Sequence, residues 1–214
     1  MKGFGKAVIE YTKELADCLG EVSTSISTQE EELEEFFRIL SEGTAIHIYG
    51  VGRSGVAALS LALRLKHFEK NLGKKVWWVG DDVRERIRKG DILIAFSGSG
   101  ETAEVIVIAE RAKDVGAKVV AITSFDDSTL ASLADLVLLL PGGLEKKRGW
   151  GYVEAQLSEL QSPFYGGGEF ELIAYLFQEA LLTAIGEFKN ISKATIAKEH
   201  EEDEMKKHNR SESF

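Results

Sequence analysis

The chain has 214 residues, of which 44% are hydrophobic and 29% are charged, and its formal net charge is −9. This length and composition are typical of one globular domain with a full-sized core. No apolar run approaches the roughly 18 residues of a membrane helix, and the N-terminus lacks the apolar core of a signal peptide. The chain is acidic and has no basic stripe, which argues against nucleic acid as a partner. We therefore expect a cytoplasmic protein with neither a membrane nor a nucleic-acid partner.

The N-terminal region, residues 1–43, predicts two helices, over 6–22 and 28–42. Thr28 followed three residues later by Glu31 is the signature of a capping box at the start of the second helix. Apolar residues then recur at helical spacing, namely Leu33, Phe36, Phe37 and Leu40.

From residue 44 to 140 the pattern alternates between short apolar runs and amphipathic stretches. The predicted strands are 44–49, 75–79, 91–96, 117–123 and 135–140. The predicted helices between them are 53–70, about 82–88, 100–115 and 126–134. The apolar runs show no alternation with polar residues, as expected for strands that are buried on both faces of a parallel sheet. The chain is thus predicted to be a single doubly wound domain over 1–214, a three-layer α/β/α sandwich with a five-stranded parallel sheet.

A glycine-rich loop follows the first predicted strand. Residues 50–55 read Gly-Val-Gly-Arg-Ser-Gly, which matches the spacing of a dinucleotide-binding turn. Gly52, Arg53 and Ser54 are candidate ligand-binding residues, because a guanidinium and a hydroxyl both bind phosphate oxygens. The pattern leaves open an oxidoreductase that binds a dinucleotide, with the aspartates that follow the second strand as the groups that hold a ribose.

A second loop, residues 97–102, follows the third predicted strand and reads Ser-Gly-Ser-Gly-Glu-Thr. Two glycines allow a tight turn, three hydroxyls supply donors, and the next helix directs its positive dipole end at the same point. Such a turn is suited to a phosphate group. The candidate phosphate-binding residues are Ser97, Gly98, Ser99, Gly100 and Thr102. If the strands 44–49 and 91–96 are neighbours, both loops flank one crevice, and Ser124 after the fourth strand adds a hydroxyl to the same edge.

The segment 141–168 contains Pro141, Pro163 and a run of three glycines, and it is long for a loop in a compact domain. We expect it to be a lid or a subunit contact. C-terminal helices are predicted over 169–214, first an apolar helix and then a charged tail. These features predict a homo-oligomer, most simply a tetramer. No group of His, Cys, Asp and Glu shows metal-ligand spacing, so no metal and no cofactor is expected.

Four short segments together resemble the sugar isomerase (SIS) domain family. They are the loop 50–55, Arg-Leu-Lys-His at 64–67, Lys-Gly-Asp at 89–91 and the loop 97–102. The resemblance extends from about residue 7 to about residue 205, and within the family it is greatest to the 6-phospho-3-hexuloisomerases. It implies a phosphosugar substrate and conversion of 3-hexulose 6-phosphate to fructose 6-phosphate through an enediolate. A non-catalytic module that binds a phosphosugar is the alternative within the same family.

The resemblance also implies the catalytic base, and two histidines are further candidates from their positions in the chain. Glu171, in a Phe-Glu pair at the start of the apolar helix, corresponds to the base that moves the proton. His200 in the tail is expected to assist by reaching the site of a neighbouring subunit. His67 lies in the helix after the first loop, where it is expected either to face the crevice or to pack in the core.

Overall fold

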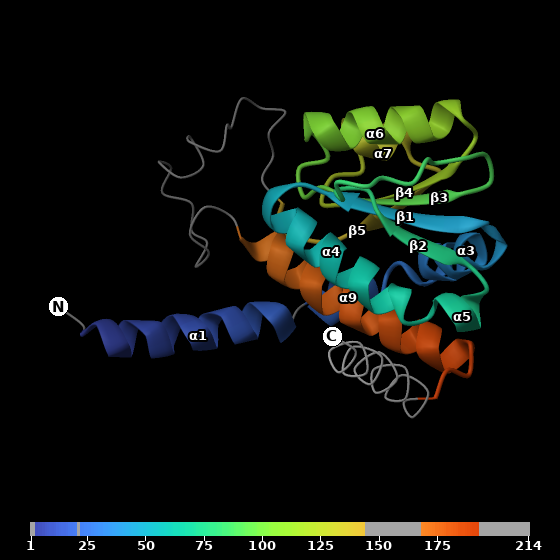
Figure 1. Ribbon diagram of the computed structural model, residues 1–214. Helices are drawn as coiled ribbons and strands as arrows, with labels where there is room; N and C mark the ends of the chain where they lie inside the picture. Colours follow the sequence, from blue (N-terminus) through green and yellow to red (C-terminus); the bar gives the residue numbers. More distant parts are fainter. Residues whose placement is uncertain (1–2, 21, 144–167, 193–214) are drawn as a thin grey trace, which may run out of the picture.

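The computed structural model describes residues 3–20, 22–143 and 168–192 (Figure 1). The helices of the described residues are α1 (Phe4–Gly20), α2 (Val22–Ile26), α3 (Glu30–Glu42), α4 (Gly52–Lys66), α5 (Glu69–Leu72), α6 (Ala103–Asp114), α7 (Thr129–Leu133) and α9 (Glu169–Phe188). The strands are β1 (Ala45–Gly50), β2 (Lys75–Trp78), β3 (Ile92–Phe96), β4 (Lys118–Thr123) and β5 (Leu136–Leu139).

The five strands form one parallel sheet in the order β2-β1-β3-β4-β5. The central strand β3 is buried along its whole length, which explains its uninterrupted apolar sequence. The order reverses between β1 and β3, so the chain switches direction across the sheet at that pair. The predicted doubly wound α/β fold with a five-stranded parallel sheet is confirmed.

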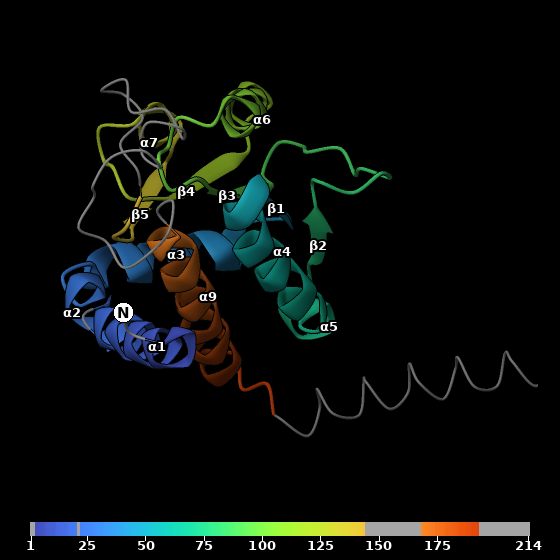
Figure 2. The same ribbon diagram turned by 90° about the vertical axis from the view of Figure 1, so that its left-hand side faces the viewer.

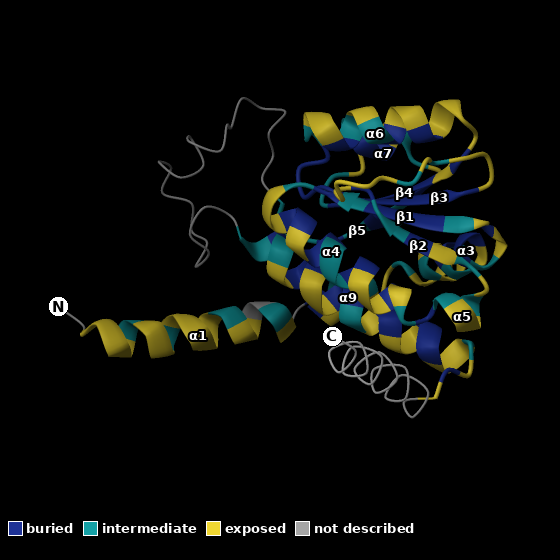
Figure 3. Cartoon of the chain, viewed as in Figure 1, coloured by how far each residue is buried: buried dark blue, intermediate teal, exposed yellow. Residues whose placement is uncertain are grey.

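Helices cover both faces of the sheet (Figures 1 and 2). The helices α6 and α7 lie on one face, whereas α3, α4 and α9 lie on the other. Two clusters of buried apolar side chains fill the spaces between the layers. Figure 3 shows the same division, with buried residues along the sheet and exposed residues on the outer sides of the helices.

The predicted helix 53–70 is observed as two helices. The helix α4 ends at Lys66, and the short α5 follows it and ends at Gly73, which has a φ of 65°. Glycine terminates a helix readily in this left-handed conformation because it has no Cβ. Phe68, between the two helices, is buried in the core under α9. The break therefore lets an aromatic side chain turn inward.

The prediction of a helix over about 82–88 is wrong. The segment from 79 to 91 is irregular and carries the chain from β2 past β1 to β3. Its sequence offers little to bury, because Val83 is 84% exposed and charged residues surround it. A short helix without an apolar face is not stable in water, so the segment has no helical structure.

The predicted capping box is also wrong. The helix α3 begins at Glu30, and the hydroxyl of Thr28 donates to the Ser25 carbonyl instead of capping α3. Gln29 precedes the helix and binds the main chain of β5 through its side-chain amide. Its Nε2 donates to the Leu139 carbonyl at 2.8 Å, and its Oε1 accepts from the Leu139 amide at 2.7 Å. This pair of hydrogen bonds ties the N-terminal region to the edge strand of the sheet.

A buried polar pair lies at the amino end of the sheet. His47 of β1 is buried, and its Nε2 lies 3.2 Å from Oδ2 of Asp91. Burial lowers the pKa of His47, and the neighbouring carboxylate only partly opposes that shift. Burial alone raises the pKa of Asp91, but hydrogen bonds from Thr44, the Arg88 amide and His47 outweigh it and lower the pKa. This pair lies at the edge of the sheet opposite to the glycine loops.

The free energy of unfolding is expected to decrease as the pH falls from about 7 to about 5. The unfolded chain takes up a proton at His47 near its ordinary pKa of 6.5, whereas the folded chain resists that proton. The unfolded state therefore binds more protons in this range. Asp91 acts in the same direction at lower pH, because its pKa falls below its ordinary 3.8. Denaturant titrations of the wild type and of His47→Gln at several pH values measure the effect. The free energy of unfolding should change less with pH in the variant than in the wild type. An equal change in both proteins would contradict the assignment.

Candidate functional site

The two glycine loops lie side by side at the carboxyl edge of the sheet. The strands β1 and β3 pair in parallel with Gly50 opposite Phe96. The residues that follow these two positions, Val51 and Ser97, therefore leave the sheet at neighbouring points. The two strands are neighbours, which is the condition for both loops to flank one crevice, and the loops meet at the switch point where α/β proteins bind ligands.

The loop 97–102 presents a compact set of hydroxyl and amide groups. The hydroxyls of Ser97 and Thr102 lie 2.9 Å apart, and the hydroxyl of Ser99 accepts from the Glu101 amide at 3.2 Å. Gly100 has a φ of 64°, a conformation that glycine adopts without strain. Thr102 is the N-terminal boundary residue of α6, but its side chain does not cap that helix. The first amides of α6 are left without a side-chain cap, which is the usual condition for anion binding at a helix N-terminus.

The Glu101 carboxylate attaches this loop to the neighbouring helix α7. The Oε1 atom of Glu101 accepts from the Thr129 amide at 2.8 Å, and Oε2 accepts from the Thr129 hydroxyl at 2.7 Å. The Leu130 amide also donates to the Gly100 carbonyl at 3.0 Å. These bonds attach the loop to the start of α7. This role could not be predicted from the sequence, because a Glu just before a helix is normally explained by the helix dipole.

Ser124, the residue that follows β4, lies at this edge of the sheet, as predicted from its position. The Ser124 amide donates to the Gly98 carbonyl at 3.1 Å. The Ser124 hydroxyl donates to the Leu140 carbonyl and accepts from the Gly143 amide at 2.8 Å. The chain that leaves β5 is thereby held against the loop 97–102. In this structure the Ser124 hydroxyl thus bonds to main-chain groups beside the site.

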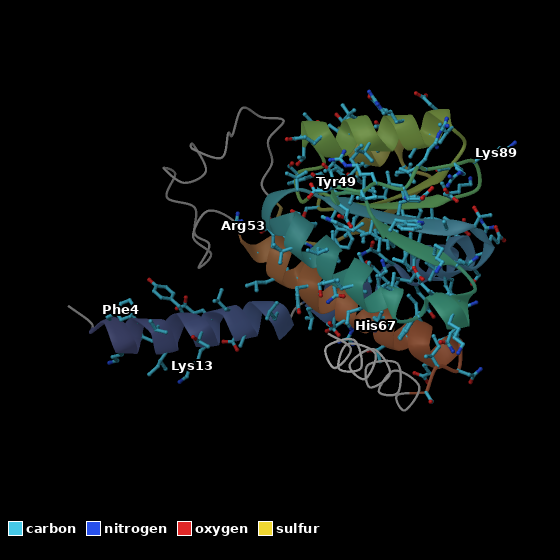
Figure 4. The ribbon with its side chains drawn as sticks, viewed as in Figure 1. Phe4, Lys13, Tyr49, Arg53, His67 and Lys89 are labelled. Atoms are coloured by element: carbon cyan, nitrogen blue, oxygen red, sulfur yellow. The ribbon has the colours of Figure 1, made fainter. Side chains whose placement is uncertain are left out.

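The first loop forms the start of α4. Gly52 has a φ of 61°, and its backbone turns directly from β1 into the helix. Gly55 lies against the backbone of Gly50, where no Cβ fits without displacing main-chain atoms. The Ser54 side chain is buried, whereas Arg53 is exposed at the end of the helix (Figure 4). This turn therefore presents one cation and one hydroxyl at the edge of the sheet.

Glu171 reaches the same place from the start of α9. Its Oε1 accepts a hydrogen bond from the Ser54 hydroxyl at 3.3 Å, and its Oε2 lies 4.0 Å from a guanidinium nitrogen of Arg53. The carboxylate is 20% exposed, and no hydrogen-bond donor of the described residues reaches the buried Oε2. The carboxylate therefore retains an oxygen that is free to accept a proton.

The preceding residue, Phe170, fixes the start of α9 against the second loop. Its ring is 1% exposed, and a Cβ added at Gly98 would lie 2.9 Å from it. A glycine at position 98 lets α9 approach the phosphate-type loop this closely. The helices α4 and α9 also pack along one another, as both views show (Figures 1 and 2). The carboxylate is thus positioned by three elements that are distant in sequence.

The structure does not bring His67 to this site within one chain. It follows the last residue of α4, whose 15 residues extend about 22 Å, so it lies at the opposite end of the helix from Arg53 (Figure 4). His200 lies outside the described residues, and so does most of the predicted lid, residues 144–167. The parts played by His200 and the lid stay predictions. In the described ranges no three residues of the types His, Cys, Asp and Glu gather as a metal site.

The chain belongs to the SIS domain family. The family model of the SIS domain matches residues 39–161, which is more than half of the chain and includes both glycine loops. The resemblance noted from the sequence motifs is thereby confirmed. None of the helices in the described residues combines the length and the apolar character needed to cross a bilayer.

Similar proteins with names that bear on function extend over most of the chain. The 3-hexulose-6-phosphate isomerases of Mycobacterium gastri and Bacillus subtilis are each 30% identical to it. The first alignment covers 83% of this chain and 82% of the relative, and the second covers 90% and 98%. A solved structure of a hypothetical protein from Methanococcus jannaschii, from which a function of 3-hexulose-6-phosphate isomerase was inferred, is 25% identical. It matches with a TM-score of 0.66 over 90% of this chain and 95% of that chain.

Replacing both Ser97 and Ser99 by Ala is expected to weaken the binding of inorganic phosphate. Hydrogen bonds to a charged group contribute about 1.5–3 kcal/mol each, so the loss should exceed tenfold in affinity, or about 1.4 kcal/mol. The rise of Tm with added phosphate measures the affinity. Ser132→Ala is the matched control, because that exposed hydroxyl bonds only within α7. An unchanged phosphate response of the double variant would show that the anion binds elsewhere.

Proposed function

We propose that the protein is a phosphosugar isomerase that converts 3-hexulose 6-phosphate to fructose 6-phosphate. One observation carries the proposal. The Glu171 carboxylate lies beside two loops suited to phosphate, with an Arg and a Ser in contact with it. A base, a cation and an anion-binding turn at one edge of a sheet are the parts that an enediolate isomerisation needs.

The second loop holds the phosphate in this proposal. The hydroxyls of Ser97, Ser99 and Thr102 and the first amides of α6 supply its donors. The two serine hydroxyls are buried and bonded within the loop, so they are ordered before the substrate arrives. Such preorganisation reduces the entropy lost on binding. The phosphate then fixes the sugar carbons at a set distance from Glu171.

Glu171 moves the proton. Its free oxygen takes the proton from C2 of the 3-hexulose, the electron pair forms the C2–C3 double bond, and the C3 carbonyl oxygen gains negative charge. Return of the proton to C3, with transfer of the O2 hydroxyl proton to O3, gives the C2 ketone of fructose 6-phosphate. Arg53 stabilises the negative charge on the enediolate oxygens, because its guanidinium already lies near the carboxylate.

The named relatives support this reaction in preference to other isomerisations. Proteins named 3-hexulose-6-phosphate isomerase align with 83% and 90% of this chain, so the similarity includes the glycine loops and the start of α9.

We also propose that the active molecule is a homo-oligomer, for which the tetramer stays the prediction. In that assembly His200 reaches the site of a neighbouring subunit.

The substitution Glu171→Gln tests the proposal. It preserves the size of the side chain and removes the base, so kcat should fall by roughly 10²–10⁴ while KM changes little. The assay converts 3-hexulose 6-phosphate and detects fructose 6-phosphate. In deuterium oxide, the wild-type product should carry solvent deuterium at C3.

Glu169→Gln is the matched control, because it removes the same charge from the same turn of α9. It should retain most of the wild-type kcat. A Glu171→Gln enzyme with near-normal kcat would assign the base to His67 or His200. A wild-type chain that binds the phosphosugar without any turnover would instead support the non-catalytic module.

A further inference from the structure

The helix α1 presents an apolar stripe to solvent. Phe4, Val8, Tyr11 and Leu15 follow one another at spacings of four, three and four residues, which places them on one side of the helix. Phe4 is 86% exposed and Tyr11 is 55% exposed. The helix projects away from the body and is exposed along most of its length (Figures 1 and 3). An isolated helix of this length is marginal in water, so its apolar side needs a surface to pack on.

A surface of matching character lies between α3 and α9. Apolar side chains line an open groove with a volume of about 250 Å³. Its walls are formed mainly by Leu33, Phe37, Phe177, Ala184 and Phe188. A second hollow continues it toward the root of α1 and shares Ile26, Leu33, Phe177 and Ala180 with it. The two together form one apolar groove along α9.

The dimensions of the helix and the groove agree. The 17 residues of α1 extend about 26 Å at 1.5 Å per residue. The part of α9 that lines the groove, from Leu176 to Phe188, extends about 20 Å by the same measure. The stripe from Phe4 to Leu15 extends about 18 Å, which is close to that length.

The same chain cannot supply that helix in the observed arrangement. Leu19 and Gly20, at the end of α1, already line the near end of the groove, and only one residue separates α1 from α2. From that end, α1 extends away from the body of the protein (Figure 1). The exposed stripe therefore reaches a groove only on another molecule.

We propose that α1 of a second copy of this chain occupies the groove between α3 and α9. Each copy inserts its own α1 into the groove of the other, which makes the contact two-fold symmetric and closed. The contact buries the apolar stripe and the groove of both copies at once. It is independent of the proposed reaction, because none of the residues assigned to phosphate binding or proton transfer takes part.

Two substitutions test the contact from opposite sides. Val8→Glu places a charge on the stripe, and Ala184→Arg fills the groove from an exposed position on α9. Burying an unpaired charge in an apolar contact is costly, so each variant should lower the association constant by about tenfold or more. Light scattering on the full-length proteins over a concentration series measures it. Lys13→Glu, on the far side of α1 from the stripe, and Thr183→Arg, outside the groove on α9, should associate like the wild type.

Mixing the two variants gives the decisive result. One wild-type α1 then meets one wild-type groove, so the mixture should form larger species than either variant alone. Circular dichroism of each variant verifies that it is folded. A monomeric wild type at micromolar concentration would overturn the proposal. Loss of association in Val8→Glu alone would assign the contact to paired α1 helices, and loss in Ala184→Arg alone would assign the groove to another occupant. Either result overturns the proposal.

Discussion

The parallel pairing of β1 with β3 is the interaction on which the site depends. Their register places Gly50 opposite Phe96, so the chain leaves both strands at the same edge and at adjacent points. A parallel sheet needs a crossover between paired strands, and here the crossovers place helices on both faces. The helix α4 begins within the first glycine loop at that edge, and α6 begins immediately after the second. Two positive helix ends therefore face the same small region.

The packing of α9 against α4 and the sheet adds the carboxylate to these loops. Phe170, Ile173, Phe177 and Leu182 of α9 are buried in the core beneath the sheet. This burial fixes the direction of α9, and the ring of Phe170 against Gly98 fixes where it begins. Glu171 follows directly, and its carboxylate accepts a hydrogen bond from Ser54. The core of the protein thus positions the proposed base, and local structure around Glu171 does not.

The two edges of the sheet use polar residues in opposite ways. At the amino edge, His47 and Asp91 are buried and bonded to each other, and Asp91 also accepts from Thr44 and the Arg88 amide, whereas Nδ1 of His47 has no partner among the described residues. At the carboxyl edge, the hydroxyls of Ser97 and Thr102 bond only to one another among the described residues, and Glu171 keeps one oxygen without a donor. What distinguishes the carboxyl edge is that its hydroxyls and its carboxylate converge at the ends of two glycine loops, where a ligand can bind to them.

The sequence by itself determined the fold class, the succession of strands along the chain and both glycine loops. Each of these features is marked by a local pattern, namely a run of Val, Ile and Leu between turns. Predictions from the sequence were wrong where local patterns compete with packing. The segment near 82–88 has helix-forming residues but no apolar face to bury, and Thr28 lost its capping role because α3 begins elsewhere. The pairing of Gln29 with Leu139 and the bracing of the loop by Glu101 join residues far apart in the chain.

The sequence could name Glu171 only through a family resemblance. Nothing in its local pattern distinguishes it from Glu169 on the same helix turn. Only the tertiary structure decided that one of these two carboxylates meets Ser54 and Arg53, because the packing of α9 sets which side of the helix faces the glycine loops. The sequence therefore determined the parts of the site, and the tertiary structure decided their mutual positions, because contacts across more than a hundred residues arise only when the layers pack together.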